Sequence, residues 1–352
     1  MKKLIGVVIG CGAIAREHLT ALAKLKNVEV AGVCDLSDVR AEATAERFAV
    51  PKWYTDYQRM VGEARPDLVH ITTPPGAHYP IAKYCLGNGF NVLCEKPIAV
   101  TYDQFLELKQ LALQNNRVLM ENHNFRFHSS VRRISDLLES GRLGEVVDVQ
   151  ILLSLDIMGK DSPYLDRNVP HSASALRGGV IGDFLPHIAY LATMFAGPAV
   201  DIRTVWTKRV QGSPLPADEF RGFIKGERAT AYVGFSANAQ PNGFWLRVAG
   251  SRMHVEADLY TPPRLSVRRL RSGEPALANM LDGIAETRAV LRGAVGGLWR
   301  KLAGTSSYDG LGELILRTYS ALETNARPPV SLEEVDEAAR IVDRFTRPEL
   351  RL

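Results

Sequence analysis

The glycine-containing turn Gly10-Cys-Gly-Ala-Ile-Ala15, close to the start of the chain, constrains the fold more than any other segment. It follows the apolar run Leu4–Ile9 and precedes a segment whose apolar residues have the spacing of an amphipathic helix. A second apolar run then ends at Asp35. A strand, a glycine turn, a helix, a strand and an acidic residue in this order predict a βαβ unit that binds a dinucleotide.

The small residues of this turn have separate physical roles. Gly10 permits the tight turn, Gly12 lets the backbone approach a pyrophosphate, and Ala15 allows the helix to pack closely on the strand. The helix that begins near Ala13 and Ile14 offers unpaired N–H groups and a positive dipole end to the phosphates. We therefore predict that these five residues bind the cofactor.

Asp35 indicates which dinucleotide binds. A carboxylate at this position would accept hydrogen bonds from the adenosine ribose hydroxyls and would repel a 2′-phosphate. The sequence therefore favours NAD over NADP. NADP stays an alternative, because Arg40 is close enough in the sequence to weaken the preference.

The opening residues can also be interpreted as a secretory signal, and Val8-Ile-Gly-Cys11 resembles the cleavage box of a bacterial lipoprotein. The apolar stretch is short for a signal and contains Gly6, and cleavage would remove the predicted first strand. We therefore interpret the segment as part of the fold and expect a cytoplasmic protein. No C-x-x-C pair occurs, so we expect reduced thiols and no metal site from the four cysteines, Cys11, Cys34, Cys85 and Cys94.

Composition narrows the classes of partner. The chain has 352 residues, which suggests two domains, and a net charge of +4, which is too small and too scattered for a nucleic-acid-binding protein. No run of about 18 uninterrupted apolar residues occurs, so a membrane-spanning helix is not expected.

Strands and helices alternate through residue 122, which predicts an α/β Rossmann-type parallel sheet. The later β runs follow one another without full crossover helices, which predicts an α+β domain with a large, mostly antiparallel, open-faced sheet. We expect a dinucleotide-binding domain over 1–122 and a substrate-binding and oligomerisation domain over 123–352, whose C-terminal helices could pack back on the first domain. Helices are expected over about 38–48, 78–88, 101–115, 130–140, 183–196, 275–302, 309–325 and 331–345.

The first segment with candidate chemistry is Cys94-Glu-Lys-Pro97, at the carboxyl end of a predicted parallel strand, where ligands bind in such sheets. Lys96 could donate to a substrate oxygen, and Glu95 could contact the nicotinamide ribose. Pro97 fixes the backbone after the lysine and could follow a cis bond. On local sequence alone, a surface Glu–Lys pair before a helix is an equally good interpretation.

The second segment contains Asp183 and His187, which are four residues apart and so share one face of a helix. We interpret Asp183 as the N-cap of that helix. A histidine near a helix N-terminus has its charged form disfavoured, which would leave a neutral base near pH 7. Taken alone, a capping aspartate and a buried core histidine are the simpler interpretation.

Together these segments resemble the glucose–fructose oxidoreductase/inositol dehydrogenase/rhizopine catabolism family, abbreviated Gfo/Idh/MocA. The matching residues follow one another in the family's order along the predicted first domain and into the second. They are Gly10–Ala15, Asp35, Thr72–His78, Glu95–Pro97, Asn124–Phe127 and the run from Gly178 to His187.

The resemblance implies an NAD(P)-dependent oxidoreductase that transfers a hydride between the nicotinamide and a secondary alcohol or ketone carbon of a sugar, polyol or nucleotide sugar. It implies that His187 is the general acid/base, that Lys96 polarises the reacting oxygen, and that Asp183 contacts a neighbouring hydroxyl. It also implies that Arg126 faces the substrate and that the open sheet face forms a homodimer or homotetramer. The further residues implied to line the cofactor pocket are Thr73, Pro74, His78, Glu95, Lys96 and Asn124.

Three further features each have two interpretations. Tyr164 and Arg177 lie near the segment that leads to His187, where they could reach the substrate, although most polar loop residues are only solvated. The segment 288–301 is basic and amphipathic, which suits packing on the sheet or, less well, contact with an anionic membrane surface.

Two other functions stay open. One is a nucleotide-sugar 3-dehydrogenase of surface-polysaccharide or antibiotic-sugar biosynthesis, in which Arg126, Arg167 and Arg177 could bind a pyrophosphate. The other is a cofactor-bound sensor without turnover. A sensor would not need the set of Lys96 and His187 with Asp183, which argues against it.

Overall fold

A computed structural model of the chain describes residues 3–159, 162, 164, 171–260, 264–269, 308 and 310–347, together with single residues and pairs between 280 and 295. Arg167 and most of the segments 275–302 and 288–301 lie outside the described residues. The chain divides into two compact units. Unit 1 comprises Met1–Asn124 and Tyr308–Arg340, and unit 2 comprises Phe125–Ser307 and Ile341–Leu352.

Unit 1 contains a six-stranded sheet in the order β3-β2-β1-β4-β5-β6, in which every neighbouring pair is parallel. The predicted first strand is one of its central strands, and Val7 and Val8 are fully buried there. The predicted parallel sheet is therefore confirmed. Its strands are β1 (Leu4–Ile9), β2 (Val28–Cys34), β3 (Trp53–Tyr54), β4 (Leu68–Ile71), β5 (Val92–Cys94) and β6 (Leu119–Glu121).

Side-chain caps mark the starts of some helices of unit 1. The Ser37 hydroxyl accepts the N–H of Arg40, and the Thr101 hydroxyl accepts that of Gln104. One helix begins at Pro75, earlier than predicted, because proline fits the first helical position. The helices are α1 (Ala13–Leu22), α2 (Asp38–Phe48), α3 (Tyr57–Ala64), α4 (Pro75–Gly87), α5 (Tyr102–Gln114) and α10 (Leu311–Thr324).

Unit 2 contains a seven-stranded sheet in the order β13-β12-β11-β7-β10-β9-β8. All neighbours are antiparallel except β7 and β10, so the predicted mostly antiparallel sheet is confirmed with one parallel pair. Leu152, Val205 and Tyr232 are exposed on it. The strands are β7 (Val146–Ser154), β8 (Ala199–Thr207), β9 (Glu219–Gly226), β10 (Thr230–Ser236), β11 (Gly243–Gly250), β12 (Met253–Asp258) and β13 (Arg264–Arg269).

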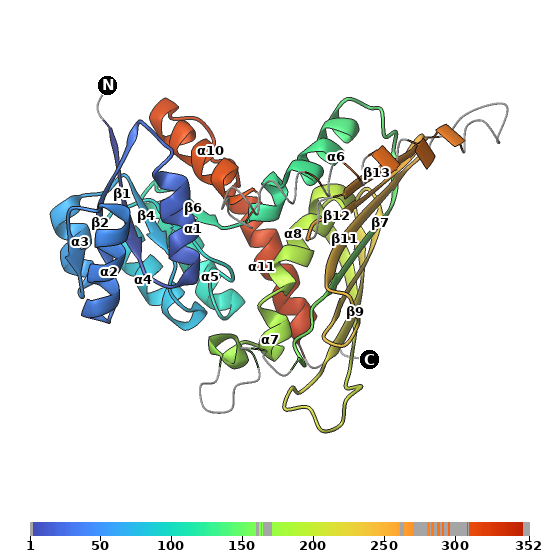
Figure 1. The fold of residues 1–352 in the computed structure, drawn as a ribbon, viewed down its shortest axis with the longest axis horizontal. Helices are drawn as coiled ribbons and strands as arrows, with labels where there is room; N and C mark the ends of the chain where they lie inside the picture. The colour runs from blue at the N-terminus through green and yellow to red at the C-terminus, as the bar shows by residue number, and fades with distance from the viewer. Residues whose placement is uncertain are drawn as a thin grey trace. The chain divides into compact units, whose positions relative to one another are not determined.

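The helices of unit 2 include α6 (Ser129–Glu139), α7 (Gly179–Gly182) and α8 (Leu185–Ala196). Figure 1 shows α8 against one face of the sheet, where it contacts β7, β9 and β10. The apolar stretch Gly179–Ala196 is long enough to cross a membrane, but 78% of it is buried within the protein, as in a core helix.

The structure corrects the predicted N-cap at Asp183. Gly178 and Gly179 adopt positive φ angles of 82° and 61°, and a short helix, α7, begins there. Asp183 follows the end of α7, and the residue before α8 is Phe184, which makes no side-chain cap. The glycine pair therefore starts the helical backbone earlier than predicted, and Asp183 lies in the turn between the two helices.

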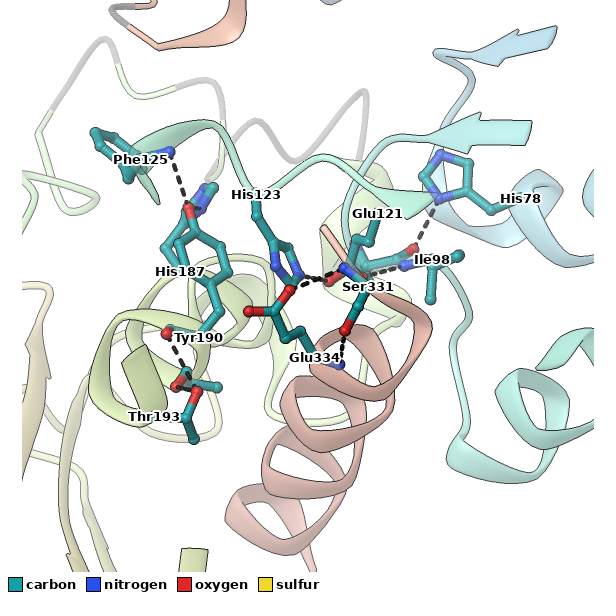
Figure 2. Close-up of polar contacts among 12 residues, drawn as sticks. His78, Ile98, Glu121, His123, Phe125, His187, Tyr190, Thr193, Ser331 and Glu334 are labelled. Atoms are coloured by element: carbon teal, nitrogen blue, oxygen red, sulfur yellow. Dashed lines mark hydrogen bonds and ion pairs between the residues drawn. The ribbon is translucent and has the colours of Figure 1, made fainter. Parts of the chain in front are cut away.

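The last helix, α11 (Leu332–Thr346), begins in unit 1 and ends in unit 2. Ser331 and Glu334 form a reciprocal cap at its start, visible in Figure 2. The Glu334 carboxylate accepts the N–H of Ser331 at 2.8 Å, and the Ser331 hydroxyl accepts the N–H of Glu334 at 3.2 Å.

Gly6 in β1 makes room for a side chain of α10, the helix that packs beside α1 in Figure 1. A Cβ atom at Gly6 would overlap the hydroxyl oxygen of Tyr319, whereas the ring carbon Cζ would be 3.5 Å away. We predict that Gly6→Ala lowers the free energy of unfolding by about 1–3 kcal/mol and that the loss is smaller in a Tyr319→Phe background. Urea unfolding of the four proteins measures both values. Equal losses in the two backgrounds would contradict this packing.

The four cysteines are free and buried. Burial raises the pKa of Cys11 to about 11 and the pKa values of Cys34 and Cys85 to about 12. We predict that a thiol-specific reagent labels none of the cysteines of the folded protein at about pH 8 and labels all four in urea, because the thiolate is the reactive form.

The same pKa shifts make the stability depend on pH. Above the ordinary thiol pKa of 9.0, the unfolded chain loses protons that the folded protein retains. We predict that the thiols make the free energy of unfolding fall as the pH rises above about 9. Urea unfolding between about pH 8 and pH 11 measures this slope, and Cys85→Ala should make it shallower. An unchanged slope in that variant would count against the buried thiol as its source.

Candidate functional site

The glycine turn of unit 1 is tied to Asp35 at the end of β2. The Asp35 carboxylate accepts the N–H of Cys11 at 2.8 Å and the N–H of Ser37 at 3.0 Å. The Arg40 guanidinium lies 3.8 Å from the same carboxylate. A carboxylate has about four lone-pair sites, so Asp35 can support the turn and still accept hydrogen bonds from a ligand.

The turn fits a bound dinucleotide. Gly10 has a φ angle of 95°, and a Cβ atom there would lie 2.8 Å from backbone atoms of Thr72 and Thr73. A Cβ atom at Gly12 would meet nothing within 4 Å, so the space beside the first turn of α1 is open. That turn holds no acidic side chain and no side-chain cap, which leaves its N–H groups for a pyrophosphate.

Thr73 adds a polar atom at the end of β4. Its hydroxyl oxygen is buried and has no hydrogen-bond partner among the described residues. The neighbouring Thr72 hydroxyl, in contrast, bonds to the carbonyl groups of Ile9 and Gly10. Because buried polar groups are nearly always hydrogen-bonded, the Thr73 hydroxyl fits a contact to a cofactor. Pro74, which was predicted with it, directly precedes α4.

The backbone on both sides of Lys96 is fixed by hydrogen bonds from different elements. The Glu95 N–H donates to the Ile71 carbonyl at 2.9 Å. The Pro97 carbonyl accepts a hydrogen bond from His78 at 2.8 Å, and the Ile98 N–H donates to Glu121 at 2.7 Å, as Figure 2 shows. The Lys96–Pro97 peptide bond is cis. The loop that carries Lys96 is therefore held in one conformation.

His78 is fully buried and has a carbonyl oxygen at each ring nitrogen. Nδ1 lies 2.8 Å from the Pro97 carbonyl and Nε2 lies 2.7 Å from the Thr73 carbonyl. Both contacts are hydrogen bonds only when each nitrogen carries a hydrogen. The structure therefore places His78 between the end of β4 and the Lys96 loop, with neither ring nitrogen turned to a ligand.

Glu95 is also buried, with its carboxylate inside unit 1. Oε1 accepts hydrogen bonds from His18 Nε2 at 2.9 Å and from Asn122 Nδ2 at 2.5 Å. Burial alone would raise the pKa of Glu95, but its hydrogen bonds with His18 and Asn122 and the charge of Lys96 hold that pKa below its ordinary value. Both bonds use the same oxygen, so Oε2 is the atom that could meet a ligand. His18 was missed in the sequence, because its partner is 77 residues away.

In unit 2, His187 is held by two residues that Figure 2 shows beside it. Its Nδ1 lies 2.8 Å from the Tyr190 hydroxyl, which also accepts the N–H of Phe125 at 3.2 Å. The Phe125 ring lies edge-on to the imidazole at a centroid distance of 5.0 Å. Tyr190 was not predicted from the sequence, although its spacing of three residues from His187 on a helix was a usable signal.

Two further predicted residues, Tyr164 and Asp183, lie at or near the turn between α7 and α8. Asp183 is half-buried there, and Phe184 follows it. The Tyr164 ring packs on His171 at 4.5 Å and on Phe184 at 6.0 Å between centroids. Tyr164 and Asp183 thus lie near the same turn.

Two predicted arginines have different surroundings. Arg177 lies 3.3 Å from the Asp343 carboxylate, and Arg347 binds the same carboxylate at 2.6 Å. Arg177 therefore has a partner within the protein. Arg126 is half-buried in the 3-10 helix η1 (Asn124–Phe127), which begins at the buried Asn124.

The predicted residues are thus divided between the units. Unit 1 holds the glycine turn, Asp35, Thr73, Glu95 and Lys96, whereas unit 2 holds Arg126, Tyr164, Arg177, Asp183 and His187.

Two family models match the chain. The model described as "Oxidoreductase family, NAD-binding Rossmann fold" matches residues 5–123, and "GFO/IDH/MocA C-terminal domain" matches residues 131–256. Together they cover more than half of the chain.

Curated relatives are similar over shorter regions. The chain is 28% identical over 267 residues, 73% of each protein, to dTDP-3,4-didehydro-2,6-dideoxy-alpha-D-glucose 3-reductase of Streptomyces violaceoruber. It is 32% identical over 188 residues to glucose-6-phosphate 3-dehydrogenase of Bacillus subtilis (strain 168), which is 53% of this chain and 52% of that protein. In several such matches, the chain spans about half the length of the relative.

A solved structure shares the fold over nearly the whole chain. Levoglucosan dehydrogenase in complex with NADH superposes with a TM-score of 0.79. The match covers 99% of this chain and 98% of that one at 17% identity.

Proposed function

Because the chain belongs to the Gfo/Idh/MocA oxidoreductase family, we propose that it is an NAD-dependent dehydrogenase or reductase acting on a secondary alcohol or ketone carbon of a sugar, polyol or nucleotide sugar. The observation that carries the proposal is the fixed loop around Lys96, beside strands whose ends fit a dinucleotide. The named activities of the curated relatives support the same class of substrate.

In this mechanism, bound NAD supplies the nicotinamide carbon that accepts or returns a hydride. Lys96 donates a hydrogen bond to the reacting oxygen and stabilises negative charge that develops on it. His187 removes the alcohol proton during oxidation and returns it during reduction. Asp183 contacts a neighbouring hydroxyl group of the substrate.

Tyr190 has a defined part in the proton transfer. To act as a base, His187 needs a lone pair on Nε2, so its hydrogen must lie on Nδ1. That Nδ1–H can be donated to the Tyr190 hydroxyl oxygen, 2.8 Å away. We propose that Tyr190 is a positioning residue that selects this tautomer and holds the ring.

A nucleotide sugar is the second candidate substrate. The match that extends over 73% of the chain is to a reductase whose name specifies a dTDP-linked sugar. Arg126 is a candidate for the pyrophosphate of such a substrate, whereas Arg177 is bound to Asp343 in this structure.

We also propose that the protein forms a homodimer or homotetramer through the open face of the second sheet. The exposed residues Leu152, Val205 and Tyr232, with Phe223 packed against Tyr232 at 5.4 Å, give that face apolar character. The four buried, free thiols favour the cytoplasm as its compartment.

The proposed roles of Lys96 and His187 can be separated from cofactor binding. We predict that Lys96→Ala and His187→Ala each lower kcat about 10²- to 10⁴-fold while the NADH dissociation constant changes less than about threefold. Tyr190→Phe should have a smaller effect on kcat, because it leaves the imidazole in place. Absorbance in the NADH band with sugars, inositols, sugar acids and nucleotide sugars measures turnover. Normal turnover in both alanine variants would refute the mechanism.

Asp35 tests the choice of cofactor. We predict that Asp35→Ala weakens NADH binding about 10- to 100-fold and brings the dissociation constants of NADH and NADPH closer together. The variant loses both the charged acceptor for the ribose hydroxyls and the charge that repels a 2′-phosphate. Asp35→Asn keeps an acceptor but no charge, so it should also bring the two dissociation constants closer together, with a smaller loss of NADH affinity. Fluorescence titration with both cofactors measures the ratio. A ratio unchanged in both variants would place Asp35 away from the ribose.

A further inference from the structure

A line of buried polar side chains connects helix α10 to the loop that carries Lys96. The Tyr319 hydroxyl lies 3.0 Å from His70 Nε2, His70 Nδ1 lies 3.0 Å from His18 Nδ1, and His18 Nε2 lies 2.9 Å from Glu95 Oε1. The two histidines are fully buried, Tyr319 is 1% exposed and Glu95 is 6% exposed. We call these four residues the histidine relay.

The relay runs through four different elements of unit 1. Tyr319 belongs to α10, His70 to the central strand β4 and His18 to α1, the helix that follows the glycine turn. Glu95 directly precedes Lys96. The relay therefore joins the helix next to the cofactor turn to the loop that holds the proposed catalytic lysine.

The donor and acceptor of each contact in the relay follow from the number of hydrogens that each group carries. Glu95 is a carboxylate and can only accept, so His18 Nε2 carries a hydrogen. If His18 is neutral, its Nδ1 accepts, so the facing His70 Nδ1 carries the next hydrogen. His70 Nε2 then accepts, and the Tyr319 hydroxyl donates to it. Each of the three contacts is then a hydrogen bond with one donor and one acceptor.

The opposite direction leaves a hydrogen without an acceptor. If His18 carried two hydrogens, His70 would have to donate from Nε2 to the Tyr319 oxygen. The Tyr319 hydroxyl makes no other hydrogen bond among the described residues, so its own hydrogen would be buried and unsatisfied. Burial also holds the pKa of His70 well below its ordinary value, which keeps that ring neutral.

We propose that His18, His70 and Tyr319 are positioning residues that fix the orientation of Glu95 and keep its Oε2 available to a hydroxyl group of the bound dinucleotide. This inference rests on the proposed NAD-dependent function. His18 and Asn122 both bind Oε1, so Oε2 is the oxygen left for that hydroxyl. Gly6 supports a specific role for the Tyr319 hydroxyl, because the absence of a Cβ atom in a buried strand is what makes room for it.

Nitrogen-15 NMR of histidine-labelled protein tests the direction of the relay without any turnover. We expect His18 to carry its hydrogen on Nε2 and His70 on Nδ1, with assignments from single His→Gln variants. In Tyr319→Phe the hydroxyl that donates to His70 is gone, so at least one of the two rings should change tautomer. A doubly protonated His18 in the unaltered protein, or unchanged tautomers in Tyr319→Phe, would overturn the proposal.

NADH binding tests whether the histidine relay affects the proposed cofactor site through Glu95. We expect Tyr319→Phe to weaken NADH binding about three- to tenfold, and His18→Leu to weaken it more, with partial recovery in His18→Gln, whose amide can still donate to Glu95. Tyr54→Phe is the matched control, because the Tyr54 hydroxyl donates to Glu63 in the same unit, outside the relay.

The NADH-binding results distinguish failure of the relay proposal from failure of the proposed function. Unchanged NADH affinity in Tyr319→Phe and His18→Leu, beside normal binding by the unaltered protein, would overturn the relay alone. No NADH binding by the unaltered protein would refute the proposed function itself, and the relay with it.

Discussion

The parallel register of β1, β4 and β5 is the constraint on which the proposed site depends. Ile9 pairs with Ile71, and Ile71 pairs with Cys94, so the three strands end in line. The glycine turn, the Thr73 hydroxyl and the Lys96 loop each begin one or two residues later and therefore meet at one edge of the sheet. Moving any one of these strands by a residue would turn its last side chains to the other face of the sheet and separate the groups.

The charges buried at this edge are paired before any ligand binds. Glu95 takes hydrogen bonds from His18 and Asn122, and Glu121 takes them from His123 at 2.7 Å and from the Ile98 N–H. Isolated carboxylates at such depth would be costly, whereas these are satisfied by partners from other elements. The Lys96 loop thus lies between two carboxylates whose orientations are already set, which is the preorganisation that the proposed role of Lys96 would require.

Local patterns predicted the features that depend on neighbours in sequence. Spacing and residue type alone predict the turn from Gly10, the strand before Asp35 and most helix positions. The sequence could not reveal that Glu95 meets His18 or that Arg177 meets Asp343, because these pairs are 77 and 166 residues apart and only the folded chain brings them together. The predicted cap at Asp183 was wrong for a local reason, since Gly178 starts a helical turn before it.

The discontinuity of unit 1 has a consequence for synthesis of the chain on the ribosome. Its sheet is complete in sequence by Glu121, but α10, which covers part of it, is made only after nearly all of unit 2. Until then, His70 has no Tyr319 beside it, and the nascent sheet lacks the helix that fills the space above Gly6. The order of translation therefore delays completion of the nucleotide-binding half until residues 125–307 of the other unit have been made.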